Sequence, residues 1–134
     1  MERNSVSSIT ITIPELPSAA LKSGFRGGWW LIRKAKVHDT EMAYMYGLAA
    51  KDGQHIPPMT PVEATVTFIF KEHRKRDLDN YGARLKGFWD GITKARIIPD
   101  DSSDHLTSIK IRFEVDKKRA PMTIITLSEV EDEI

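Results

Sequence analysis

The chain contains no cysteine among its 134 residues. This absence excludes thiol catalysis, zinc–thiolate sites, iron–sulfur clusters and disulfide bonds. A chain of this length can bury roughly two-thirds of the surface that it exposes when unfolded, so it needs no covalent or metal staple in order to fold. We therefore expect a single domain that covers residues 1–134.

Long apolar runs are also missing. No stretch reaches the about 18 residues that a membrane span needs, and Met1–Thr10 lacks the apolar centre of a signal peptide. Both absences favour a cytoplasmic protein with no membrane partner. The net charge is only +1, but it is unevenly spread, because an acidic tail covers residues 129–134 and a basic run, KEHRKR, covers residues 71–76. Such a run can attract phosphate even when the net charge is near zero.

Four segments alternate between apolar and polar residues as β-strands do. They are Ser8–Ile13, Val62–Phe70, Leu106–Val115 and Met122–Leu127. The last of them is apolar on both faces, which predicts a central strand. Asp116–Ala120 is long enough to join the last two strands as an antiparallel hairpin.

Helical spacing of apolar residues predicts one helix over Asp39–Ala50 and a second over Asp79–Lys94. Residues 17–37 are expected to form a long loop, with a short strand at Trp29–Ile32. Trp29 and Trp30 could stack on bases, although we expect at least one of them to cover the core. The order of elements predicts an α+β fold, with a mixed β-sheet and about two helices packed on one face.

Five aspartates occur between Lys75 and Asp101, namely Asp77, Asp79, Asp90, Asp100 and Asp101. If Asp77 and Asp79 extend the preceding strand, both side chains point to one face. Two adjacent carboxylates repel each other unless a cation lies between them. Magnesium prefers oxygen ligands of this kind.

A continuous helix would place Lys86 and Asp90 within roughly 20° of the direction of Asp79. The Asp100–Asp101 turn could fold back toward the same place. Carboxylates, a metal ion and an ammonium group are the parts that phosphodiester hydrolysis uses. The basic residues expected to bind flanking phosphates are Arg74, Lys75, Arg76, Lys34 and Lys36.

Each of these motifs also has an ordinary explanation. An Asp-x-Asp pair is usually a solvated turn, Lys86 and Asp90 can form an exposed i,i+4 pair, and residues 100–104 can form a polar turn. The residues alone therefore leave open the choice between a metal site and a polar surface.

The combination of motifs nevertheless resembles one family. Arg76-Asp77-Leu78-Asp79-Asn80, then Leu85-Lys86, Asp90-Gly91-Ile92 and Pro99-Asp100-Asp101-Ser102 are similar to the RusA family of Holliday junction resolvases. The segment 11–18, ITIPELPS, is similar to that family's opening strand and Pro-Ser turn.

The resemblance implies a homodimer that binds four-way DNA junctions and cuts them with Mg²⁺ or Mn²⁺. It implies catalytic residues at Asp77, Asp79, Asp101 and Lys86, and metal ligands at Asp77, Asp79, Asp100 and Asp101. Arg76 would contact the DNA backbone, whereas Asp90 and Asn80 match the motif without an assigned role. The expected protein is a structure-selective endonuclease of phage or prophage type.

Two departures from the family pattern stand out. Three additional residues separate Asp79 from Lys86, and Ala19 and Ala20 stand where the family often has asparagine. Two other hypotheses therefore remain. One is a catalytically inactive module of the same fold that binds branched DNA, and the other is an interaction protein whose aspartates lie in surface turns.

Overall fold

The protein, described here by a computed structural model over residues 7–130, contains one four-stranded sheet. Its strands are β1 (Ser8–Ile13), β2 (Val62–Phe70), β3 (Leu106–Val115) and β4 (Met122–Glu129), in the order β1-β4-β2-β3. β4 runs antiparallel to both β1 and β2, whereas β2 and β3 are parallel. The predicted mixed sheet is confirmed, and so is the central position of the last strand.

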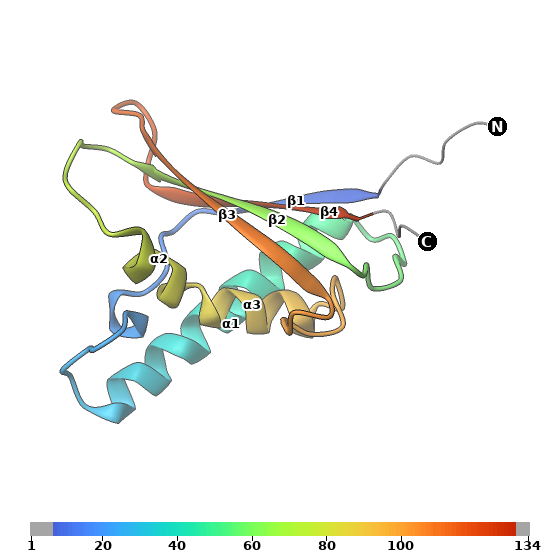
Figure 1. Ribbon diagram of the computed structural model, residues 1–134, viewed down its shortest axis with the longest axis horizontal. Helices are drawn as coiled ribbons and strands as arrows, with labels where there is room; N and C mark the ends of the chain where they lie inside the picture. The colour runs from blue at the N-terminus through green and yellow to red at the C-terminus, as the bar shows by residue number, and fades with distance from the viewer. Residues whose placement is uncertain (1–6, 131–134) are drawn as a thin grey trace.

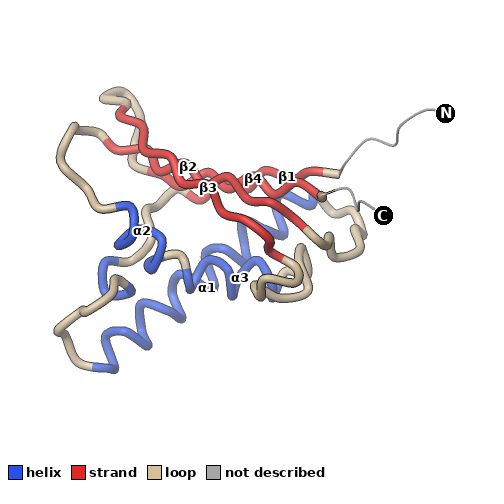
Figure 2. Tube along the Cα trace, in the orientation of Figure 1, coloured by secondary structure: helices blue, strands red, loops and turns tan. Residues whose placement is uncertain are grey.

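The helices lie on one face of this sheet, as Figures 1 and 2 show. They are the 3-10 turn η1 (Ala19–Leu21) and the α-helices α1 (Trp29–Lys51), α2 (Leu78–Arg84) and α3 (Lys86–Lys94). The α+β architecture with helices on one face is therefore confirmed. The acidic tail predicted over residues 129–134 falls mostly outside the described residues.

The predicted hairpin between the last two strands is wrong. β2 lies between β3 and β4, and the connection after β3 crosses the end of β2, where the Asp116 amide donates to the Phe70 carbonyl at 2.8 Å. A parallel pair requires a crossover connection, and the segment that contains α2 and α3 supplies it for β2 and β3. β3 is consequently an edge strand, and its apolar residues Ile109 and Val115 are exposed.

The predicted loop over residues 17–37, with a short strand at Trp29–Ile32, is also wrong. α1 begins at Trp29, directly after Gly28 in extended conformation, so Asp39 lies within the helix and not at its start. The side chains of Trp29 and Trp30 are 72% and 57% exposed. Neither of these residues covers the core.

The core lies between the sheet and the helices. It includes the predicted apolar stripe of the second helical segment, because Leu85, Phe88, Trp89 and Ile92 are all buried. These side chains meet the inner faces of β2, β4 and β1. Within residues 7–130, no helix combines the length and apolar character needed to cross a membrane.

α1 and α3 approach each other closely at two glycines. A Cβ atom added at Gly87 would lie 2.6 Å from the Asp39 Cβ. One added at Gly91 would meet the Thr40 carbonyl oxygen and lie 2.6 Å from the Ala43 Cβ. Since these neighbours are backbone or Cβ atoms, they cannot rotate away, and the separation of the two helices depends on glycine at both positions.

We expect Gly91→Ala to lower the free energy of unfolding by about 2–3 kcal/mol, because α1 and α3 must move apart to accept the methyl group. Gly82→Ala is the matched control. A Cβ there would make only an ordinary contact with Ile111 Cδ1 at 3.5 Å, and alanine favours a helix by about 1 kcal/mol. Urea denaturation of both variants measures the difference, and equal stability of the two would contradict the close-approach argument.

Candidate functional site

Asp77 and Asp79 lie at the start of α2 and not at the end of a strand. β2 ends at Phe70, and a loop over residues 71–76 follows. Asp77 is the N-cap of α2, and its side chain accepts a hydrogen bond from the Asp79 amide at 2.9 Å. The assumption that both side chains share one strand face is therefore wrong, because these residues begin a helix. The Asp77 side chain instead satisfies an otherwise unpaired helix amide.

Lys86 connects two of the other predicted residues. Its ammonium nitrogen lies 3.2 Å from Asp90 Oδ1 and 3.0 Å from Asp101 Oδ2. Asp90 Oδ2 in turn lies 3.2 Å from the Nζ of Lys36 on α1. These four residues form an ion-pair chain, Lys36–Asp90–Lys86–Asp101, that joins α1, α3 and the turn after α3. The turn thus folds back onto Lys86, as expected for Asp101.

The predicted single helix from Asp79 to Lys94 is wrong. α2 ends at Arg84, and Leu85, with φ −74° and ψ −8°, separates it from α3. Lys86 and Asp90 are an i,i+4 pair within α3, whereas Asp79 belongs to the first turn of α2. The predicted common stripe is therefore divided between two helices.

The pKa values of two site residues are shifted by their neighbours. The hydrogen bond to Asp101 is the largest cause of the raised pKa of Lys86; burial opposes it, and the contact with Asp90 adds a smaller increase. Lys86 is therefore held as an ammonium ion. Hydrogen bonds from Ser102, whose amide donates to Asp100 Oδ1 at 2.7 Å, lower the pKa of Asp100 and favour its carboxylate form.

A basic groove opens beside α2. We use this name for the hollow lined by residues 74–81 and by Arg84. The Arg76 guanidinium carbon lies 3.6 Å from the centre of the Phe70 ring, and that of Arg84 lies 4.4 Å from the centre of the Tyr81 ring. Asp77 and Asp79 lie in the same groove. Arg84 was not predicted, although its position three residues after Tyr81 on a helix was a usable signal.

An aromatic cluster attaches α2 to the sheet. Tyr81 contacts Phe68, Phe70 and Phe113, with ring centres 5.1, 5.5 and 5.3 Å away. Edge and tilted ring contacts of this kind are favourable beyond their burial of surface. Because α2 contains no fully buried residue, the position of Asp79 depends on this cluster together with the contacts of α2 with η1 and α3.

The predicted carboxylates thus fall into separate places. Asp77 and Asp79 line the basic groove, Asp101 ends the ion-pair chain, and Asp100 lies 3.7 Å from the His105 ring. In the part of the chain that the structure describes, no three acidic or histidine side chains lie close enough to hold a metal ion. The donor type fits magnesium, which commonly uses one or two carboxylates and completes its shell with water and substrate phosphate.

The remaining predicted residues lie on α1, in the loop before α2 and on α2 itself. Lys34 and Lys36 lie on α1 and not in a loop; Lys34 is exposed, whereas Lys36 pairs with Asp90. Arg74 and Lys75 are exposed in the basic groove, and Asn80 is half-buried on α2. The structure therefore places Lys36 with the ion-pair chain and Arg74–Arg76 with the groove.

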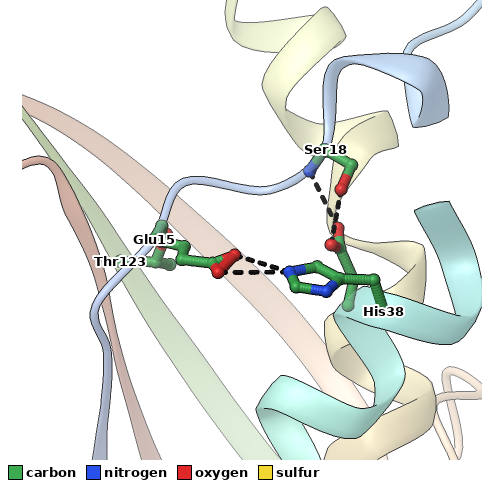
Figure 3. A network of polar contacts seen from close by, with 5 residues as sticks. Glu15, Ser18, His38 and Thr123 are labelled. Carbon is green, nitrogen blue, oxygen red and sulfur yellow. Dashed lines mark hydrogen bonds and ion pairs between the residues drawn. The ribbon is translucent and has the colours of Figure 1, made fainter.

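A polar network joins the Pro-Ser turn to α1 and β4 (Figure 3). Buried Asp39 accepts hydrogen bonds from the Ser18 amide at 2.8 Å and the Ser18 hydroxyl at 2.6 Å. Burial raises the pKa of Asp39, and these two bonds oppose the shift. His38 Nε2 lies 2.7 Å from Glu15, whose carbonyl accepts from the Thr123 hydroxyl at 2.8 Å.

Comparison with known proteins does not assign the chain to a family. No protein-family model matches it, and no curated protein matches it significantly.

We expect the free energy of unfolding to fall as pH rises from about 5.5 to about 8.5. The Glu15 carboxylate raises the pKa of His38 above its ordinary value of 6.5, so protonated His38 stabilises the fold below that pH, and this contribution disappears as pH passes the raised pKa. His38 is half-exposed, so the effect should be about 0.5 kcal/mol. Denaturant titrations should show that His38→Gln and Glu15→Gln both remove it, and an unchanged pH profile would contradict the assignment.

Asp101→Asn should make Lys86 react faster with acetic anhydride at mildly alkaline pH. The Asp101 hydrogen bond is the largest cause of the raised pKa of Lys86, so its loss increases the fraction of free amine. Asp90→Asn should have a smaller effect. Mass spectrometry can follow the labelling, with exposed Lys110 on β3 as the internal reference. A larger acceleration in Asp90→Asn than in Asp101→Asn would reverse the order of these two contacts.

Proposed function

We propose that the chain is a Mg²⁺-dependent, structure-selective endodeoxyribonuclease of the RusA type. It resolves four-way DNA junctions by paired phosphodiester hydrolysis, in DNA recombination or repair and in the cytoplasm. The main support is the contact of Lys86 with Asp101 at 3.0 Å. This contact joins two motifs, 15 residues apart, that the resemblance to RusA resolvases assigns to one site.

In this proposal, Asp77 and Asp79, which line the groove together, would hold the Mg²⁺ or Mn²⁺ ion. Asp101, with Asp100 beside it, lies apart from them in this structure and would have to move toward them to join the same ion. The ion would activate a water molecule and neutralise developing charge. Lys86, an ammonium ion in its present contacts, provides a hydrogen-bond donor for the phosphate oxygens. The exposed cations Arg74 and Lys75 would bind flanking phosphates and orient the strand.

Paired cutting requires two copies of the chain, because one set of these residues cuts one strand. We therefore propose a homodimer. The outer surface of α1 exposes the apolar side chains of Val37, Met45 and Leu48, and exposed apolar surface of this kind is common at protein interfaces.

A catalytically inactive module that binds branched DNA is the second candidate. The observation that favours it is that Lys86 and Lys36 already neutralise Asp90 and Asp101. In that case the ion-pair chain stabilises the packing of α1, α3 and the following turn, and the cations of the basic groove bind DNA without cutting it.

We expect Asp79→Asn to reduce cleavage of a synthetic four-way junction by about 100-fold or more while leaving junction binding intact. The substitution keeps the shape of the side chain and removes the charge that would hold the ion. Asp104→Asn, at an exposed position in the turn after α3, is the matched control and should cut like the wild type.

The assay uses Mg²⁺ or Mn²⁺, with linear duplex and flap DNA as competing substrates. Undiminished cutting by Asp79→Asn would refute the catalytic assignment. Tight junction binding by the wild type without cleavage in either metal would favour the inactive module.

A further inference from the structure

The basic groove carries more positive charge than its own acids neutralise. It is lined by four cationic side chains and two carboxylates. Among residues 7–130, only Arg74 of these four cations forms an ion pair, with Glu72 at 3.6 Å, and both of those side chains are about two-thirds exposed or more. The two carboxylates, Asp77 and Asp79, offset only two of the four positive charges. The groove is therefore suited to an anion.

Arg84 is one of two cations of the groove that lie against an aromatic ring, the other being Arg76 over Phe70. The Arg84 guanidinium lies over the Tyr81 ring, and that ring is fixed by the aromatic cluster. Its Nε atom is buried and has no hydrogen-bond partner in the described part of the chain. Buried polar groups are almost always paired in folded proteins, so the unpaired Nε donor of Arg84 is an exception among the described residues.

The geometry of a guanidinium group identifies the class of anion. Its planar fork of donors matches two oxygens of a phosphate, and stacking on an aromatic ring leaves the edge of the fork free. A side chain that is already immobilised also loses little entropy on binding. These properties favour an oxyanion with two accessible oxygens over a diffuse counterion. A carboxylate would match the fork as well, so the choice of a phosphodiester rests on the proposed function.

We infer that the basic groove binds a backbone phosphate of DNA, with Arg84 as its anchor and Arg74, Lys75 and Arg76 beside it. The choice of DNA as the polymer rests on the proposed function. The site of contact rests on the groove itself. Arg84 then acts in binding, and it holds the strand beside Asp77 and Asp79 without taking part in bond cleavage.

The test is the fluorescence anisotropy of a labelled four-way junction in EDTA, where no metal-dependent cutting can occur. Arg84→Ala should weaken binding about 10-fold, and the slope of log affinity against log salt should become shallower by about 0.9, as expected for one lost phosphate contact. Arg84→Lys should keep the slope and lose part of the affinity. The matched control is Arg112→Ala, at an exposed position on β3 outside the groove, which should bind like the wild type.

Circular dichroism establishes whether each variant is folded. If Arg84→Ala is not folded, the binding of Arg84→Lys decides the result. The inference is overturned if the folded Arg84 variants bind DNA like the wild type or like Arg112→Ala. It is also overturned if only RNA binding is lost. Because binding is measured without metal, this result is independent of whether Asp79→Asn affects cleavage.

Discussion

The close approach of α1 and α3 at Gly87 and Gly91 is the constraint on which the rest of the site depends. The absence of side chains at these glycines lets Ala43 and Thr40 reach the backbone of α3. The same approach allows Lys36 on α1 to reach Asp90 on α3, and Asp39, beside Gly87, to hold Ser18. Steric fit between two helices therefore fixes both the ion-pair chain and the turn that follows β1.

The packing of the helices stabilises the fold more than the ion pairs on their surface do. Burial of Phe88 and Ile92 fixes α3 firmly, whereas the ion pairs of Lys86 join half-exposed side chains and contribute little to stability. Such pairs exchange partners at low cost when a more highly charged group arrives. A phosphate or a divalent cation can therefore reorganise Lys86 and Asp101 without disturbing the packing of the helices beneath them.

Much of the fold could be predicted from the sequence, because alternation marks strands and two apolar faces marked β4 as central. The pairing of the strands could not be predicted, since nothing in the alternation of Leu106–Val115 distinguishes β2 from β4 as its partner. The break at Leu85 was hidden because apolar spacing continues across it. The contact of Lys86 with Asp101 followed from a turn of plausible length, whereas the burial of the Arg84 Nε depends on packing that spacing does not describe.

The division between α2 and α3 separates the two halves of the proposed site. α3 buries five residues and carries Lys86 and Asp90, whereas α2 buries none and carries Asp79 and Arg84. Elements with few buried contacts are the ones that open or shift at least cost. The relative position of Asp79 and Lys86 is therefore set by the Tyr81 contacts and by whatever occupies the basic groove. A DNA strand whose phosphate is bound by Arg84 would fix α2 against the β-sheet. Binding of the substrate and assembly of the carboxylates would then occur together.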